Sequence, residues 1–384
     1  MSWDSVVGQQ RIKRILRAAL RSGRLPHAYL FHGPDGVGKD AMAIELAKIV
    51  NCVNEKDEAC DVCESCRRVN SLQHPDVFLV FALPVGKGEK SGDPPLAKLS
   101  AEEVEAVHEQ LRLKASNRYH DILVPRATTI KVNSIRELRR QASLSTFHGR
   151  KKIMIIMEAA DLNDEASNAL LKTLEEPTED TMIILTTSKR GVLLPTITSR
   201  CQDVRFDFLN EVEIASHLMA RHQLDEANAG LIARLAHGSV ARATGLLNVD
   251  LQRQREFAVG FLRKTAMNDP AEISQFIDEL VKAYDRIEIE QLLLLMEFWL
   301  RDAFCVSEGR ATIANIDSEE SIRRFAQRYP SLDYGKLQGA LERSISLLNK
   351  NVYIPLVLLT LSLTIRRLML SAKKHEAPSH ELKK

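Results

Sequence analysis

The sequence predicts a parallel α/β domain over residues 1–208, followed by an all-helical region. Up to about Phe208, short apolar strand-like segments alternate with helical segments, which favours a parallel sheet covered by helices on both faces. Beyond Phe208 the helical pattern continues without a convincing strand. At 384 residues the chain exceeds what one hydrophobic core usually serves, so two or three domains are expected.

The expected elements can be placed in order along the chain. They are a helix within 6–24, a strand at 28–32, a glycine-rich turn, a helix after residue 39, a strand at 75–81, a charged helix near 101–114, a helix at 135–145, a strand at 152–157, a helix at 163–175 and a strand at 181–186. Pro177 ends the helix at 163–175, because proline lacks the N–H that a helix interior needs. Helices follow at 211–222, 227–237 and 241–247, with longer ones to about residue 371.

These elements group into three expected domains. The α/β domain (1–208) carries a cysteine-rich module at 52–66 and a polar, partly mobile insertion at 86–129. A small helical domain at 209–250 and a helical bundle at 251–372 complete the fold. The polar tail at 373–384 is expected to be disordered, since it has no core to join.

Composition narrows the class of protein. Hydrophobic residues make up 45% and charged residues 27%, which is ordinary for a soluble globular protein. The net charge of +2 gives no overall signal for nucleic acid, so any DNA contact is expected to be local. The N-terminus lacks a secretory pattern, and the apolar stretch near Ile354–Ile365 is too short and too interrupted to span a bilayer. A cytoplasmic location, and a buried helix for that stretch, are expected.

A phosphate-binding loop is predicted between the strand at 28–32 and the next helix. Its residues are Gly33, Pro34, Asp35, Gly36, Val37, Gly38, Lys39 and Asp40, with the spacing of the G-x-x-x-x-G-K motif. Glycines let backbone N–H groups surround phosphate oxygens, and the lysine adds a positive charge beside the helix N-terminus. The alternative is a glycine turn with an exposed lysine, which the element order disfavours.

The metal side of this predicted nucleotide site is altered. Asp40 stands where Ser or Thr normally binds Mg²⁺, and it brings negative charge close to the phosphates. Met157 ends the strand at 152–157, where a metal-orienting Asp is expected, while Glu158 keeps the position of the carboxylate that polarises water. Binding of ATP and Mg²⁺ is therefore expected to be weak, and turnover doubtful. Thr186 and its neighbours could sense a γ-phosphate or form an ordinary strand end.

Four cysteines form a candidate metal site. Cys52, Cys60, Cys63 and Cys66 offer four sulfur ligands, which suits a closed, structural Zn²⁺ site. An iron–sulfur cluster and free thiols are the alternatives. The module could stabilise a loop whose own core is small, or it could contact a partner through Arg67 and Arg68.

Taken together, these motifs resemble the AAA+ clamp-loader family, which includes bacterial DNA polymerase III gamma, tau and delta prime and replication factor C. The resemblance covers residues 1 to about 208. It is carried by the segments Val7–Gln9, Leu25–Phe31, Asn168–Pro177 and Ser199-Arg200-Cys201, which occur in the family's order. The segment from Gly238 to Arg242 is similar to the family's sensor 2, which makes Arg242 a further candidate nucleotide contact.

The resemblance implies roles for these residues. In the family, the arginine of Ser-Arg-Cys is an arginine finger that reaches a neighbour's nucleotide site; here that role falls to Arg200, and planar guanidinium suits phosphate oxygens. An altered phosphate site beside an intact Ser199-Arg200-Cys201 is the pattern of members called delta prime. The family also implies the zinc module, a helical lid at 209–250 and a C-terminal collar at 251–372.

The expected partners follow from the same resemblance. They are gamma or tau and delta subunits in a heteropentamer, a sliding clamp, and primed DNA reached through the complex, with no membrane. The chain would help to load the clamp, as a component of a DNA polymerase holoenzyme with little or no ATPase of its own. Two other functions stay open at this point: an active gamma/tau-like ATPase, and a zinc-dependent DNA-binding protein on an inactive ATPase scaffold.

Overall fold

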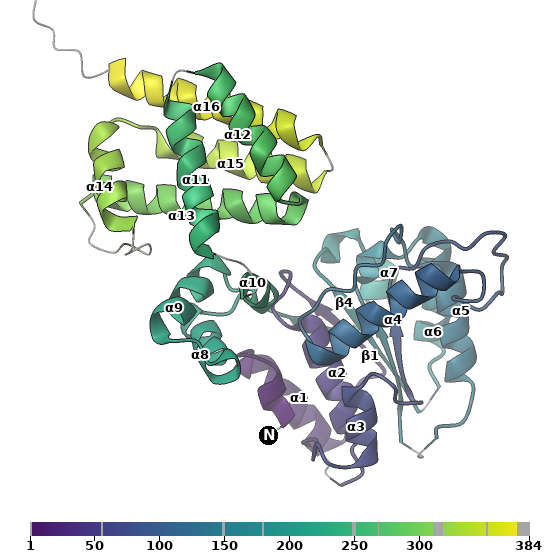
Figure 1. The fold of residues 1–384 in the computed structure, drawn as a ribbon. Helices are drawn as coiled ribbons and strands as arrows, with labels where there is room; N and C mark the ends of the chain where they lie inside the picture. The colour runs from purple at the N-terminus through teal and green to yellow at the C-terminus, as the bar shows by residue number, and fades with distance from the viewer. Residues whose placement is uncertain are drawn as a thin grey trace, which may run out of the picture. The chain divides into compact units, whose positions relative to one another are not determined.

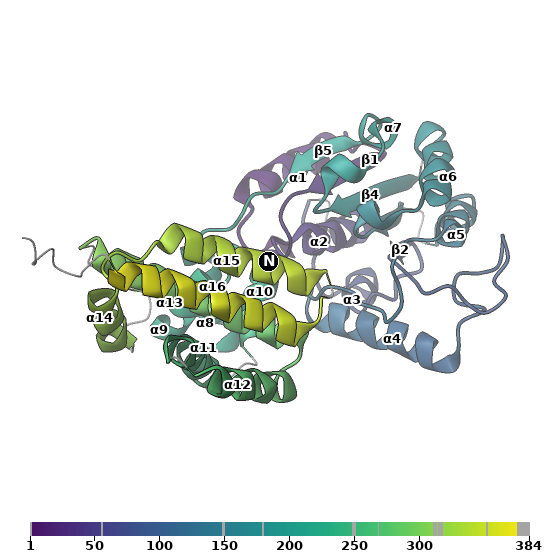
Figure 2. The ribbon, with the colours of Figure 1, turned by 90° about the horizontal axis from the view of Figure 1, so that it is seen from above.

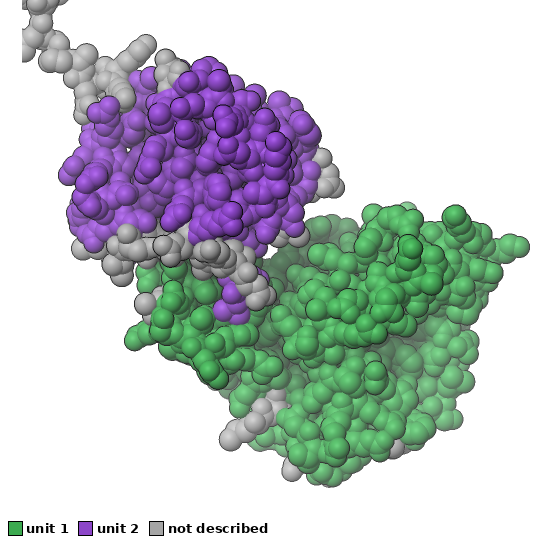
Figure 3. Space-filling model, viewed as in Figure 1, with its two compact units in different colours: residues 1–244 green, residues 245–384 purple. Residues whose placement is uncertain are grey.

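A computed structural model describes residues 2–54, 57–147, 150–178, 180–247, 251–267, 269–309, 313, 318–350 and 352–374. The chain divides into two compact units, residues 1–244 and residues 245–384 (Figure 3). The boundary between the two units, after residue 244, lies a few residues before residue 250, where the expected small helical domain ends. The expected tail at 373–384 lies outside the described residues, except that 373 and 374 end the last helix.

The first unit is built on a five-stranded parallel sheet. Its strands are β1 (Ala28–His32), β2 (Val77–Val80), β3 (Lys152–Ile156), β4 (Thr181–Thr187) and β5 (Gln202–Arg205), in the order β2-β3-β4-β1-β5. Central strands β3 and β4 are fully buried, which explains their continuous apolar sequence. The sequence did not predict β5, because this edge strand buries Val204 and exposes the polar residues around it.

Helices of the first unit cover both faces of this sheet (Figures 1 and 2). The helices of the first unit are α1 (Gln10–Ser22), α2 (Lys39–Asn51), α3 (Glu64–Asn70), α4 (Ala101–Ser116), α5 (Val132–Ala142), α6 (Asp164–Glu175), α7 (Pro195–Thr198), α8 (Glu211–His222), α9 (Glu226–Leu235) and α10 (Val240–Leu246). Helix α2 contacts β1, β3 and β4. Helices α5 and α6 share a core with the opposite face, where Leu30, Met154 and Ile183 are buried. The predicted parallel α/β fold is confirmed.

The second unit is helical throughout its described residues. It contains α11 (Leu251–Ala266), α12 (Pro270–Ala283), α13 (Arg286–Ser307), α14 (Glu319–Arg328), α15 (Tyr334–Asn349) and α16 (Ile354–Lys374). Helix α16 contacts α11, α12 and α15. Pro270 stands in the first turn of α12, where its missing N–H costs nothing, and the side chain of Asp269 accepts hydrogen bonds from the first free N–H groups.

Helix α16 is only partly buried, contrary to the expectation of a buried helix. Ile354–Ala372 is, among the described residues, the one helical stretch long and apolar enough to cross a membrane, and a single such stretch is weak evidence for a span. One face is buried, with Leu361 and Ile365 at its centre. The opposite face exposes an apolar stripe, defined by Tyr353, Leu356, Leu359, Leu363 and Leu370. The sequence did not separate these faces because nearly every position in the segment is apolar or small.

Candidate nucleotide site and cysteine cluster

The predicted phosphate loop lies at the carboxyl edge of the sheet, between β1 and α2. The segments that end the neighbouring strands β3 and β4 meet it there, as the parallel order requires. Gly33 has φ 147°, and a Cβ placed on it would collide with the backbone carbonyl of Phe206. The tight turn therefore needs glycine at this position. Lys39 and Asp40 are the first two residues of α2.

Lys39 is turned onto its own loop. Its Nζ donates hydrogen bonds to the carbonyl oxygens of Gly33, at 3.0 Å, and Pro34, at 2.8 Å. Two carboxylates lie further away, Asp35 at 3.8 Å and Glu158 at 3.9 Å. The side chain of Lys39 is 5% exposed. The Lys39 ammonium, which the motif would supply to a phosphate, is therefore already hydrogen-bonded within the protein.

Asp40 is likewise paired within the protein. Its Oδ2 accepts a hydrogen bond from Lys114 Nζ at 2.8 Å, and its Oδ1 accepts one from Thr186 Oγ1 at 2.6 Å. Burial acts to raise the pKa of Asp40, but the Lys114 charge and the two hydrogen bonds outweigh it and hold the pKa below the usual value. The carboxylate is thus ionised, with both oxygens engaged.

The two residues after β3 differ in their surroundings. Met157 is buried and offers no oxygen ligand. Glu158 has φ 45°, and its Oε2 accepts hydrogen bonds from the N–H and hydroxyl of Ser188 at 3.1 and 3.2 Å. Burial raises the pKa of Glu158, and the Lys39 charge only partly opposes this. Glu158 therefore places a partly buried carboxylate near the loop, whereas position 157 supplies none.

The expected insertion supplies residues that sequence reasoning missed. Lys114, at the end of α4, is 1% exposed, and Tyr119 lies directly against Gly38, where an added Cβ would be 3.0 Å from Tyr119 Cε1. Together with the loop and Glu158, these residues surround a cavity of about 30 Å³. That volume suits about one water molecule, whereas ligand pockets usually measure about 300–1,000 Å³.

The helices expected as a lid also contact the loop. The carbonyl oxygen of Gly36 accepts hydrogen bonds from the N–H groups of Val240, at 2.9 Å, and Ala241, at 3.3 Å, at the start of α10. Arg242 is exposed and does not line the cavity. The candidate sensor 2 residue therefore directly follows Ala241, which contacts the loop, but it is not part of the cavity wall.

Arg200 follows α7, on the surface and apart from the cavity beside Lys39. Its guanidinium donates to the carbonyl of Thr196 at 2.9 Å and lies 2.8 Å from Glu175 Oε1. The side chain of Arg200 is 36% exposed. Its neighbour Cys201 packs against the core, and burial raises the pKa of this thiol to about 12. Arg200 therefore lies on a surface turn, and the adjacent Cys201 anchors this turn to the core.

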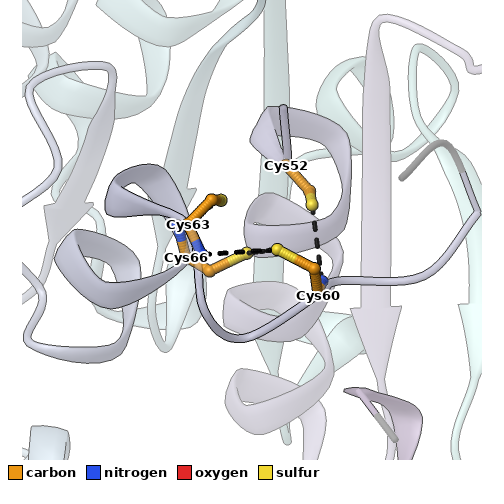
Figure 4. A group of neighbouring side chains, drawn as sticks. All are labelled: Cys52, Cys60, Cys63 and Cys66. Atoms are coloured by element: carbon orange, nitrogen blue, oxygen red, sulfur yellow. Dashed lines mark hydrogen bonds between the residues drawn. The ribbon is translucent and has the colours of Figure 1, made fainter. Parts of the chain in front are cut away.

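The four predicted cysteine ligands come together (Figure 4). Their sulfur atoms all lie within 4.8 Å of one another. In a tetrahedral zinc–thiolate site, Zn–S bonds of about 2.3 Å place the sulfurs about 3.8 Å apart, so small shifts bring these four into range. Their contributing residues are Cys52 at the end of α2, Cys60 and Cys63 in the following loop, and Cys66 in α3.

Local groups act differently on two thiols of this cluster: burial raises the pKa of Cys66, whereas backbone N–H groups lower that of Cys60. Burial acts to raise the pKa of the Cys60 thiol, but the backbone N–H groups of Cys63 and Val62 lower it to about 6. A thiolate is the form that binds metal. Lys48 Nζ holds Asp61 of the same loop at 2.6 Å and Glu45 of α2 at 3.0 Å. The cluster can therefore hold a structural metal ion, and its loop is tied to α2.

The comparisons with known proteins bear on the N-terminal part of the chain. The family model described as DNA polymerase III, delta subunit, matches residues 8–210, which is more than half of the sequence. The chain belongs to this family. A DNA polymerase III subunit delta′ of Bacillus subtilis is 32% identical over 250 residues, which cover 65% of this chain and 61% of that protein. The tau subunit of the same organism is 31% identical over 258 residues, covering 64% and 37%.

The family match therefore confirms the clamp-loader resemblance drawn from the sequence. The aligned region spans less than two thirds of these relatives' own lengths. Among solved structures, a DNA polymerase III gamma subunit-related protein of Thermotoga maritima has a TM-score of 0.41 and 14% identity, covering 94% of this chain and 99% of that one. The delta-subunit family match extends through the phosphate loop, the cysteine cluster and Arg200.

Proposed function

We propose that the chain is a delta prime-like subunit of the DNA polymerase III clamp loader. It joins gamma or tau and delta subunits, helps to load the sliding clamp onto primed DNA in the cytoplasm, and contributes Arg200 to a neighbour's nucleotide site. Its own nucleotide site does not turn over ATP. One observation carries the proposal: Lys39 and Asp40 are engaged inside the protein, while Arg200 is held on the surface.

The surface position of Arg200 supports a role in trans. The side chain does not line the cavity beside its own phosphate loop, so it cannot serve a nucleotide there without a large rearrangement. Its present partners are Glu175 and a backbone carbonyl, and an exposed ion pair of this kind contributes only about 0–1 kcal/mol. A neighbour's phosphates could replace Glu175 at little cost, because guanidinium binds phosphate oxygens with several donors.

The cysteine cluster supports a structural role for zinc in this subunit. Four sulfur ligands close the coordination shell and leave no open position for substrate, so the metal would fix the loop between α2 and α3. Ligand identity and sulfur spacing both fit. The bound ion would contribute to folding and not to a reaction.

Assembly is proposed to use the second unit. The apolar stripe of α16, with Leu363 at 58% and Leu356 at 56% exposure, is unusual for a surface helix and suits a protein partner. A collar made by this unit and its counterparts in the other subunits would cover it. The chain would then join the complex through α16 and act on its neighbour through Arg200.

The test is ATP turnover by a reconstituted clamp loader with clamp and primed DNA. Arg200→Ala in this subunit should reduce turnover by about 10³-fold at the site it serves, whereas Lys39→Ala should leave turnover nearly unchanged. Arg205→Ala is the control, since Arg205 is another exposed arginine of the same region, beside Asp207. Loss of turnover in Lys39→Ala, with ATPase activity in the isolated wild-type chain, would instead identify an active gamma/tau-like ATPase. Strong, salt-sensitive DNA binding by the isolated chain would identify the DNA-binding alternative.

A further inference from the structure

The segment that covers the phosphate loop (residues 114–121, here the covering segment) is anchored to it by an ion pair. Lys114 Nζ lies 2.8 Å from Asp40 Oδ2 and donates a second hydrogen bond, at 2.7 Å, to the carbonyl of His120. The ammonium therefore joins the phosphate loop to the covering segment itself. Because Lys114 is 1% exposed, water does not screen this pair effectively.

Two further contacts hold the covering segment in place. The hydroxyl of Tyr119 accepts a hydrogen bond from the N–H of Val7 at 2.7 Å, and its ring rests on Gly38. Arg118 donates to the carbonyl and side-chain oxygens of Asn70 at 3.1 and 3.0 Å. The covering segment is thus fixed to the phosphate loop, to the N-terminal residues and to α3.

The charged side chains of Lys39 and Asp40 are thus satisfied without a ligand. Lys39 bonds its own carbonyls and Asp40 bonds Lys114 and Thr186. A magnesium-nucleotide would have to displace Lys114 from Asp40 and move Tyr119 away from Gly38. The remaining cavity of about 30 Å³ cannot hold a nucleotide, which needs a pocket of about 300 Å³ or more.

We propose that the covering segment is an internal closure of the phosphate loop, in which the Lys114 ammonium replaces a bound cation beside Asp40 and excludes magnesium-nucleotide while the contact stands. The inference deepens the proposed function, since it takes the loop to be a nucleotide site that has lost turnover. The two can fail separately: the closure is tested by binding to the isolated chain, and the proposed function by turnover of the complex.

The proposal is tested with Lys114→Met/Tyr119→Phe, which removes the ammonium and the hydroxyl but keeps most of the side-chain volume. Amide hydrogen exchange of residues 114–121 should become at least about tenfold faster, and saturable binding of millimolar MgATP, measured by calorimetric titration, should appear, because apparent affinity follows the open fraction. Arg112→Met is the matched control: Arg112 lies on the same helix, is 64% exposed and pairs with Glu105 and Glu109. It should change neither measurement.

The wild-type chain provides a second, independent arm. Millimolar MgATP should give no saturable binding and no change in exchange at residues 33–40. Saturable binding with residues 114–121 still protected would overturn the closure, and so would a double variant that exchanges faster without binding MgATP more tightly. If the double variant does not fold, Tyr119→Phe alone carries the test: it leaves the ion pair intact and should still accelerate exchange of residues 114–121, and unchanged exchange would count against the proposal.

Discussion

Arg200 and Glu175 form an ion pair of 2.8 Å between the turn after α7 and the last residue of α6. Both side chains are partly exposed, at 36% and 49%, so solvent screens the pair. The arginine proposed to act on a neighbour is therefore positioned, but weakly held, in the isolated chain.

Glu175→Gln should consequently release Arg200 at little cost in stability. We expect a change of less than about 1 kcal/mol in the free energy of unfolding, and no loss of turnover in the reconstituted complex. Denaturant unfolding and steady-state turnover measure the two effects. Glu176→Gln, which changes the adjacent exposed residue, is the control. A large loss of turnover in Glu175→Gln would show that the carboxylate is needed in the assembled state.

The ion pair of Asp40 and Lys114 predicts a pH dependence of stability. The pKa of Asp40 is lowered in the folded chain, so its contribution is fully present above the ordinary carboxyl value near 3.8 and is lost as the pH falls through the lower folded-state value. Wild type should therefore lose stability in acid relative to Asp40→Asn/Lys114→Met, which lacks both charges. Unfolding of the two proteins is compared at a series of pH values; both keep the cysteine cluster, so its own acid sensitivity cancels. If the stabilities of the two proteins changed in parallel with pH, the Asp40–Lys114 pair would not be the source of the pH dependence.

Removing one partner of this pair should cost more than removing both. Lys114→Met leaves Asp40 buried without its counter-charge and should destabilise the protein by about 3–5 kcal/mol, whereas the double neutral variant should recover much of that loss. Urea unfolding of the single and double variants measures the difference. Equal stability of Lys114→Met and wild type would mean that the pair contributes nothing.

Gly33 and Gly191 offer a matched test of the phosphate loop. Gly33→Ala places a Cβ against the carbonyl of Phe206 at φ 147°, while a Cβ on Gly191 meets open space. We expect Gly33→Ala to destabilise the protein by about 1–3 kcal/mol and Gly191→Ala to have little effect. Thermal unfolding separates them. Equal melting temperatures of the two variants would mean that the phosphate loop accommodates the added Cβ without strain.

The cysteine cluster should bind metal through all four thiols. Cys52→Ser should lower the bound zinc, measured by elemental analysis of the purified chain, and reduce the melting temperature, because the closed site loses a ligand. Cys305→Ser alters a cysteine outside the cluster and should retain the metal. Stoichiometric zinc in Cys52→Ser would remove Cys52 from the ligand set.

The apolar stripe of α16 should control assembly. Leu363→Glu changes a side chain that is 58% exposed, so the isolated chain should keep its helical content and melting temperature. Binding to the other clamp-loader subunits, measured by size-exclusion chromatography, should weaken because a charge would be buried at the interface. Leu363→Met keeps the surface apolar and should assemble normally. Normal assembly of Leu363→Glu would exclude the stripe from the interface.

The positions of the glycine-rich loop and of the cysteine cluster could be located from the sequence because each depends on short spacings. Glycines and lysine over Gly33–Lys39, and four cysteines between 52 and 66, carry their geometry locally. Asp40 stands out in the sequence as unusual for this motif, but its partner Lys114 is 74 residues away and no local pattern joins them. The edge strand β5 was missed for a similar reason. Its pairing with β1 stabilises it as a strand, whereas its own polar residues give no strand pattern.

A signal for Lys114 was nonetheless present in the sequence. Val107 and Lys114 lie on the same face of α4, two helical turns apart, and both are buried. A buried lysine needs hydrogen-bond acceptors for its ammonium, and Asp40, at a position where a hydroxyl is usual, supplies a carboxylate for Lys114. The Asp40 carboxylate and the Lys114 ammonium compensate each other in the structure.

Helix α2 begins at the phosphate loop with Lys39 and ends at Asn51, directly before Cys52. Its 13 residues make a rod about 20 Å long, and both of its ends are clamped, one by Lys114 and one by the cysteine loop through Lys48 and Asp61. Because a helix is stiff, a change at one end of α2 should also affect the residues at its other end. Removal of the metal and loss of the Lys114 contact should therefore both destabilise α2, and the phosphate loop and the cysteine cluster should unfold together.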